Sequence, residues 1–177
     1  MRKRRWIPGL TVLVLCGALT SVSVAASPHF TKNGVPACTD TGSQLVCSGE
    51  LVGLGNADLV ISLRADALAT FLCGAPGNSN VAPGANKVPF TATGSQTIPG
   101  SAIKNGRASF SVTAPTTPPT ATPEQAGCPN SNWHVIRAED IDFANINLTI
   151  AQGGVLLFTC THPGAVPEGG TVTLSCS

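Results

Sequence analysis

The densest charged cluster in the chain spans residues 137–142 (RAEDID), and its acidic side chains are the first candidates for chemistry. In an extended segment Asp140 and Asp142 lie on one face, because side chains alternate with a period of two. With Asn145 or Asn147 they would offer Ca²⁺ the oxygen ligands that it prefers. The spacing does not match an EF-hand, since apolar residues interrupt the acidic ones and the loop glycine is missing. We interpret the cluster as a solvated strand edge and predict no metal site.

Nucleophilic and acid–base chemistry would need a histidine or a second acid near these carboxylates. The histidines, His29, His134 and His162, are dispersed, and no Gly-x-Ser-x-Gly turn is present to expose a nucleophilic serine. The glycines at residues 53–55 open no helix, so they do not form a phosphate-binding loop. We predict no catalytic residue and no cofactor. The alternative is a small hydrolase with a dispersed active site, which would place Asp140 or Asp142 beside His134.

Cysteine is the remaining reactive residue type, and six cysteines follow residue 26: Cys38, Cys47, Cys73, Cys128, Cys160 and Cys176. An even set behind an export signal predicts disulfide bonds formed in an oxidising compartment. Short separations favour pairing Cys38 with Cys47 and Cys160 with Cys176, which leaves Cys73 with Cys128. A Cys47–Cys160 bond across the core is the alternative. A zinc site is disfavoured because no Cys-x-x-Cys pair occurs.

Residues 1–26 have the pattern of a signal peptide. Four basic residues precede the apolar run at residues 10–19, and Ala25-Ala26 provides the small residues of a cleavage site. The apolar run is shorter than the roughly 20 residues that a spanning helix needs. Cys16 lies inside this run and would be removed with it. We expect a chain secreted to the extracellular space or the cell surface, with no membrane span after cleavage.

The charge balance changes when residues 1–26 are removed. Six Lys and Arg then face nine Asp and Glu, a net charge of −3 in place of +1. The basic residues are scattered and form no stripe along which a phosphate backbone would bind. Nucleic acid is therefore excluded as a partner, and an extracellular protein or glycan is expected.

Short segments with a period of two, separated by Gly-, Pro- and Asn-rich turns, dominate the rest of the chain. They predict an all-β, disulfide-bonded antiparallel β-sandwich, immunoglobulin-like or related, with eight or nine short strands. The expected strands are residues 44–52, 58–64, 67–73, 87–93, 107–113, 132–137, 141–151, 155–161 and 171–176. The alternation slips at Ala144-Asn145, which predicts a β-bulge, and Gly153-Gly154 predicts a hairpin turn.

Two stretches fall outside this pattern. Residues 27–43 are expected to be a flexible N-terminal stretch, so that residues 44–177 form a single β domain. Residues 114–127 carry four prolines among Thr and Ala, which predicts an exposed loop, because proline cannot donate to a strand ladder. Its threonines are candidates for O-linked sugar.

The segments GLGN (residues 53–56), GSQTIPGSAIKNG (94–106) and GCPNSNW (127–133) occur together with IDFANINLTIAQGGVLLF (141–158). In this combination the chain resembles a group of small exported bacterial proteins, common in actinobacteria, that have no established activity. The resemblance covers residues 45–158. It implies a secreted β domain and assigns no site residue.

Three functions are compatible with these observations. The leading hypothesis is a non-catalytic secreted or cell-surface domain that binds a partner or belongs to the envelope. The second is the small hydrolase described above. The third is a carbohydrate-binding module, which is weakened by the absence of Tyr and by Trp133 being the only Trp after residue 26, because sugars stack on planar rings.

Overall fold

The computed structural model describes residues 27–77 and 79–177, and these form two antiparallel sheets. The strands are β1 (His29–Phe30), β2 (Ala37–Asp40), β3 (Leu45–Val52), β4 (Leu59–Gly74), β5 (Val81–Pro83), β6 (Val88–Ile98), β7 (Ala108–Ala114), β8 (His134–Gln152), β9 (Val155–Ala165), β10 (Thr171–Thr173) and β11 (Ser175–Cys176). A 3₁₀ turn, η1 (Gly100–Ala102), precedes β7, and one short helix, α1 (Pro123–Ala126), precedes β8.

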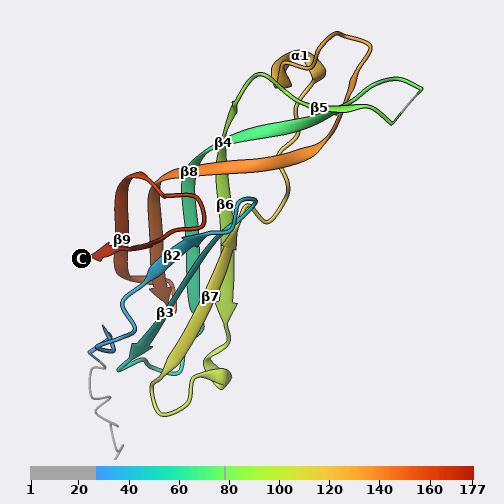
Figure 1. Ribbon diagram of the computed structural model, residues 1–177. Coiled ribbons are helices and arrows are strands. Elements are labelled where there is room, and N and C mark those ends of the chain that lie inside the picture. The colour runs from blue at the N-terminus through green and yellow to red at the C-terminus, as the bar shows by residue number, and fades with distance from the viewer. Residues whose placement is uncertain (1–26, 78) are drawn as a thin grey trace, which may run out of the picture.

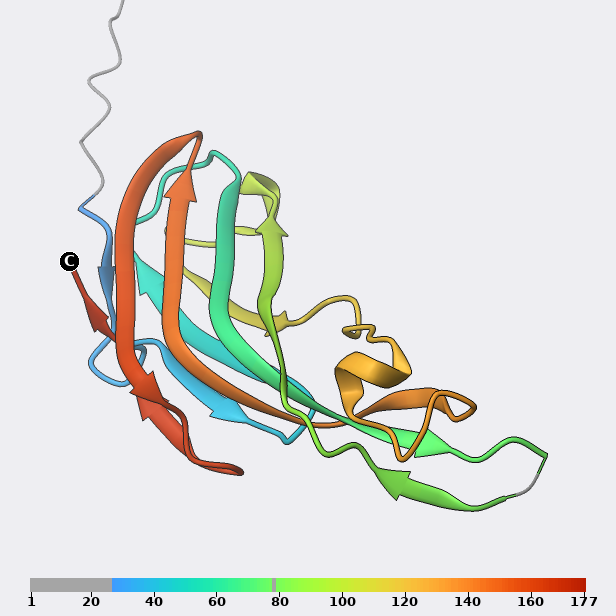
Figure 2. The same cartoon turned by 90° about the horizontal axis from the view of Figure 1, so that it is seen from above.

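In the first sheet, β3 pairs with β1, β2 and β7, and β2 pairs with β10. In the second, the order is β11-β9-β8-β4-β5, and β6 also pairs with β4. Figure 2 shows the two sheets stacked as a sandwich. The predicted all-β, disulfide-bonded sandwich is therefore confirmed.

Alternation along β4 determines which of its faces enters the core. From Leu59 to Ala69 the odd-numbered side chains are buried and the even-numbered ones are exposed. Small residues of β4 lie beside large ones on β8, as where Ala67 is opposite Phe143. Pairing small with large side chains lets facing positions interdigitate in the core. Burying an aromatic or aliphatic side chain of this size contributes about 1.5–3 kcal/mol, so β4 and β8 carry much of the core.

The distal ends of β4 and β8 extend beyond the sandwich and, with β5 and α1, form a projecting arm (Figures 1 and 2). The Cys73–Cys128 disulfide joins the end of β4 to the segment after α1. A capping box, in which the Thr122 side chain accepts from the Gln125 N–H, fixes the start of α1. The disulfide and the capping box stabilise the arm beyond the region where the two sheets pack on each other.

The three disulfides are Cys38–Cys47, Cys73–Cys128 and Cys160–Cys176, as the short separations predicted. Two of them join residues that are directly opposite on paired strands, Cys38 with Cys47 and Cys160 with Cys176. The alternative Cys47–Cys160 bond is excluded by these partners.

Several boundaries differ from the sequence prediction. Eleven strands lie within residues 27–77 and 79–177, and β4 and β8 are long, with 16 and 19 residues, because each merges two segments that were expected to be separate. In place of a flexible stretch over residues 27–43 the structure has β1 and β2, with Cys38 tied to β3 through Cys47. The expected loop at 114–127 ends in α1.

Two local predictions on β8 and β9 are confirmed. The ladder between β4 and β8 shifts between Arg64 and Asp66, and Asn145 in the bulge has φ 51°. Gly153 and Gly154 both have positive φ in the β8–β9 hairpin turn, as a type I′ turn requires.

The signal peptide predicted for residues 1–26, with Cys16, lies outside the described residues. Within residues 27–77 and 79–177, no helix has the length and apolar character needed to cross a membrane.

Candidate functional site

The outer face of the second sheet carries two rows of polar side chains that the strand register lines up. One row is Thr159, Thr149, Ser62 and Ser95 on β9, β8, β4 and β6, and the next is Thr161, Asn147, Arg64 and Thr93 on the same strands. Neighbouring residues within a row are about 4.8 Å apart, which is the spacing between adjacent strands. We call these eight residues the polar face.

The side chains of the polar face point away from the core because their neighbours in the chain point into it. Leu63 and Leu148, which flank Arg64 and Asn147, are buried in the core between the sheets. The face includes an open hollow of about 570 Å³, over β4, β6 and β8. Its walls are Ser62, Leu63, Arg64, Thr93, Gly94, Ser95, Thr116, Asn147 and Thr149. Hydroxyls, one amide and one guanidinium therefore define its chemistry.

Arg64 is the one cation of this face, and it is exposed. Within the described part of the chain the ion pairs are Lys87–Asp142 and Arg107–Glu50, so Arg64 forms no ion pair there. The carboxylate one row away, on Asp66, accepts a 3.0 Å hydrogen bond from Asn145 Nδ2. Asn145 Oδ1 in turn accepts from the Gly164 N–H at 3.1 Å, which locks the bulge to the end of β9.

A second hollow, of about 620 Å³, lies where the arm meets the sandwich. It is bounded by the proline-rich loop, by the turn between β2 and β3, and by β8. Its walls are Ser43, Gln44, Pro115, Thr116, Pro118, Pro119, Thr120, Ile136, Arg137, Ala138 and Ile141. Two of the loop threonines, Thr116 and Thr120, line this second hollow while remaining exposed, as predicted for the loop. The lining of this hollow contains no carboxylate and no histidine.

The acidic residues that the sequence singled out, Asp140 and Asp142, lie near the base of the arm and close enough to Asp40 to act on its carboxyl. Asp40 is buried, and burial raises the pKa of its carboxyl, with the charges of Asp140, Glu168 and Asp142 acting in the same direction. The Gly42 N–H donates to Asp40 Oδ1 at 2.8 Å and opposes that increase. Asp142 forms an exposed 2.5 Å ion pair with Lys87, which raises the pKa of the lysine.

This cluster does not assemble the oxygen cage considered for Ca²⁺. Asn145 is engaged with Asp66 and Gly164, and Asn147 lies on the polar face. Across residues 27–77 and 79–177, no group of three or more His, Cys, Asp or Glu is arranged to hold a metal ion.

The histidines stay dispersed. His134 is opposite Gly74 at the distal end of the arm, six residues along β8 from Asp140, and His162 is opposite Ile146. His29 lies on β1, where its ring bonds the Ser27 carbonyl. None of the hollows described here is lined by a histidine. The His134–Asp140 arrangement that a dispersed hydrolase site would require is therefore not formed.

A third hollow, of about 570 Å³, brings two carboxylates together. Asp66 and Asp142 line it with Leu68, Phe90 and Phe143. Asp66 accepts a hydrogen bond from Asn145 and Asp142 pairs with Lys87, so each acid has a partner of its own in the fold.

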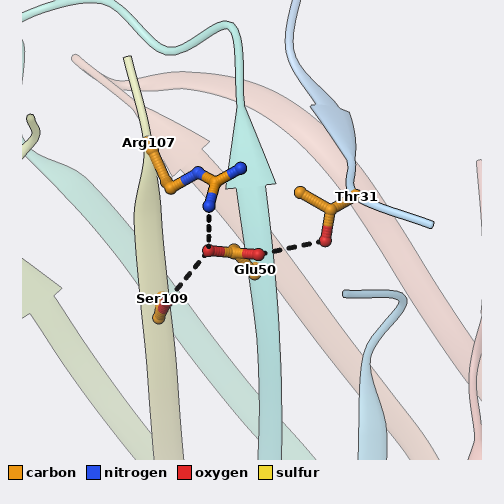
Figure 3. Close-up of polar contacts among 4 residues, drawn as sticks. All are labelled: Thr31, Glu50, Arg107 and Ser109. Atoms are coloured by element: carbon orange, nitrogen blue, oxygen red, sulfur yellow. Dashed lines mark hydrogen bonds and ion pairs between the residues drawn. The ribbon is translucent and has the colours of Figure 1, made fainter. Parts of the chain in front are cut away.

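On the first sheet, Glu50 joins three strand regions (Figure 3). Its carboxylate accepts from Thr31 Oγ1 at 3.1 Å and from Ser109 Oγ at 3.5 Å, and it pairs with Arg107 at 3.3 Å. The cluster is satisfied internally, so it stabilises the fold and leaves no charge for a ligand.

Sequence reasoning did not identify the polar face. Its only signal in the chain is the run of polar residues at alternate positions within predicted strands, as at Ser62 and Arg64 or Asn147 and Thr149. Trp133, considered as a sugar platform, is half-buried and packs against the core. A scan against protein-family models gives no match, and a search of curated proteins finds no relative.

Proposed function

We propose that this chain is an exported, non-catalytic binding domain of the extracellular space or cell surface, and that its polar face contacts a protein or glycan partner. The observation that carries the proposal is the polar face itself. It gathers hydroxyl, amide and guanidinium groups, which form hydrogen bonds, over an open hollow. It contains no base to activate its hydroxyls as nucleophiles, and such activation is what catalysis by Ser or Thr requires.

Export is supported by the three disulfides of the fold. Three bonds join six cysteines, and such bonds persist in oxidising compartments. The basic and apolar segments of residues 1–26 add the pattern of a signal peptide.

A binding experiment with matched variants tests the proposal. The full chain, exported by a bacterial host, is sedimented with isolated actinobacterial cell envelopes. Ser62→Ala with Thr149→Val removes two hydroxyls from the polar face, and Ser48→Ala with Ser111→Ala removes two exposed hydroxyls from the first sheet. We expect wild type and the Ser48/Ser111 variant to sediment with the envelopes and the Ser62/Thr149 variant to remain in solution.

The same preparation is incubated with chromogenic ester, glycoside and peptide substrates. We expect no turnover. Turnover that Asp142→Asn abolishes would assign the chain to the hydrolases. Equal sedimentation of all three proteins, or none by the wild type, would remove the polar face as the contact site.

A further inference from the structure

We infer that the polar face takes a glycan that carries carboxylates, with Arg64 binding a carboxylate and the flanking rows binding sugar hydroxyls. This inference rests on the proposed function and adds the chemical class of the ligand.

The first step is the charge of the face. Arg64 is an exposed guanidinium near the centre of the two rows, and no acid in residues 27–77 or 79–177 pairs with it. Arg64 is the one charged side chain among the eight residues of the polar face, so it is the positive site of that face, with the carboxylate of Asp66 one row away held by Asn145. A guanidinium binds a carboxylate through two parallel N–H···O bonds, which gives both strength and orientation.

The second step is the chemistry around that cation. Asn147 and Thr93 flank Arg64 in its own row, and Ser62 and Thr149 occupy the adjacent row. Hydroxyls both donate and accept, and the amide supplies two donors and one acceptor. Ser95 already donates to the Ile61 carbonyl at 3.1 Å, so its oxygen remains as an acceptor. These groups match a ligand rich in hydroxyls.

The polar face fits an acidic glycan better than it fits nucleic acid or an acidic peptide. Nucleic acid would need several basic residues along its backbone, and the face has one. An extended acidic peptide binds best at an open strand edge or beside apolar pockets. The hollow is centred on β4, which has strands on both sides, and also extends over β6 and β8, and its lining has no aromatic ring. Without ring stacking, a charge-assisted bond must provide much of the affinity, which favours an acidic over a neutral sugar.

Affinity electrophoresis of the full exported chain tests the inference. Native gels contain polygalacturonate, alginate or hyaluronan, and matched gels contain methyl-esterified polygalacturonate, dextran or polyglutamate. We expect retardation by at least one uronate polymer, loss of that retardation in 0.5 M NaCl, and none by the esterified polymer. The salt effect follows because the Debye length falls to a few ångströms.

Variants identify the residue responsible. Arg64→Gln is expected to weaken binding roughly tenfold, the effect of losing one charged hydrogen-bonding group, and Arg64→Lys to weaken it less. Lys32→Gln removes the same charge from an exposed turn outside the polar face and is expected to match the wild type. Urea midpoints of all variants confirm that each is folded.

Other results would contradict the binding of an acidic glycan by the polar face. Equal retardation by esterified polymer or dextran, or an unchanged Arg64→Gln variant, overturns the inference while the proposed function stands. Retardation by polyglutamate as strong as by any uronate polymer assigns the face to an acidic protein segment. If no gel retards the wild type, the acidic-glycan assignment is wrong, and envelope sedimentation alone then decides the proposed function.

Discussion

The backbone N–H of Gly42 donates a 2.8 Å hydrogen bond to the Oδ1 atom of Asp40, whose side chain is 2% exposed. This bond partly compensates a carboxylate that the fold removes from water at the base of the arm. The compensation is incomplete, since burial and the neighbouring acids still raise the Asp40 pKa above its ordinary value of 3.8.

The raised pKa predicts how stability depends on pH. The folded state binds the Asp40 proton more tightly than the unfolded state, so this contribution to stability is present below pH 3.8 and is lost as pH rises through the folded pKa. Asp40→Asn keeps an acceptor for Gly42 and carries no charge. We expect its stability relative to wild type to increase from pH 3 to pH 7, as measured by urea unfolding. A relative stability that is constant across this range would show that Asp40 does not titrate as described.

Asp58→Asn is the matched control. Asp58 Oδ1 also accepts a 2.8 Å bond from a backbone N–H, that of Gly100, but its side chain is exposed. Asp58→Asn thus makes the same chemical change at an exposed carboxyl and controls for the general effect of the substitution at each pH.

The disulfides should differ in their contribution to stability. The Cys73–Cys128 bond closes a 55-residue separation and the Cys38–Cys47 bond one of 9 residues. The entropy of loop closure predicts losses of about 4 and about 2.5 kcal/mol when each pair is replaced by Ala. Urea unfolding of the two double variants measures the difference. The reverse order would mean that the local contacts of the arm, and not the loop length, determine the effect.

Gly94 is required where β6 passes β7. A Cβ at this position would lie 2.0 Å from the carbonyl oxygen of Thr113, a backbone atom that cannot rotate away. Gly94→Ala is expected to destabilise the fold by about 1–3 kcal/mol, as overpacking does. Gly55→Ala is the control, since its Cβ would meet no atom closer than 3.7 Å. Similar thermal midpoints for the two variants would contradict the close approach.

Asn145 combines a positive φ with two side-chain hydrogen bonds, to Asp66 and from Gly164. Asn145→Ala loses both bonds and puts alanine in the left-handed region, which Asn tolerates through its local side-chain hydrogen bonds, so a loss of about 2–3 kcal/mol is expected. Asn145→Gly loses the same bonds without the conformational cost and should be less destabilising. Chemical denaturation of both variants tests this order, and a glycine variant less stable than the alanine variant would contradict it.

The sandwich was predictable because apolar and polar residues alternate within its main strands. Leu59, Ile61 and Leu63 alternate with polar residues, and the slip at Ala144-Asn145 marks the bulge directly. The same reasoning divided β4 in two, because Ala65 gives a weak apolar signal. In the structure Ala65 and Ala67 occupy inward-facing positions of β4. Ala67 lies opposite Phe90 of β6 and Phe143 of β8, and its small side chain leaves room for their rings.

Features that depend on distant pairing were not predictable. β2 lies in a Gly- and Thr-rich stretch, and its partner β10 is more than 130 residues later, where Thr39 and Thr171 share a 2.8 Å hydrogen bond. The polar face likewise depends on pairing between strands that are far apart in the sequence. Nothing local indicates that Arg64 is in register with Asn147, and the row exists only once β4, β6, β8 and β9 are paired.

The segment from β10 to β11 has a consequence for the order of folding. β10 pairs with β2 in the first sheet, and three residues later Cys176 pairs with Cys160 in the second. One short piece of chain thus joins the two sheets, and both of its pairings come late in the sequence. Cys160 and Cys176 are only 16 residues apart, whereas the β2–β10 pairing has a high contact order and forms slowly, because a long loop must close before it contributes. The edge of β2 therefore stays open until late in folding, and an unpaired strand edge is where one folding chain can pair with another copy.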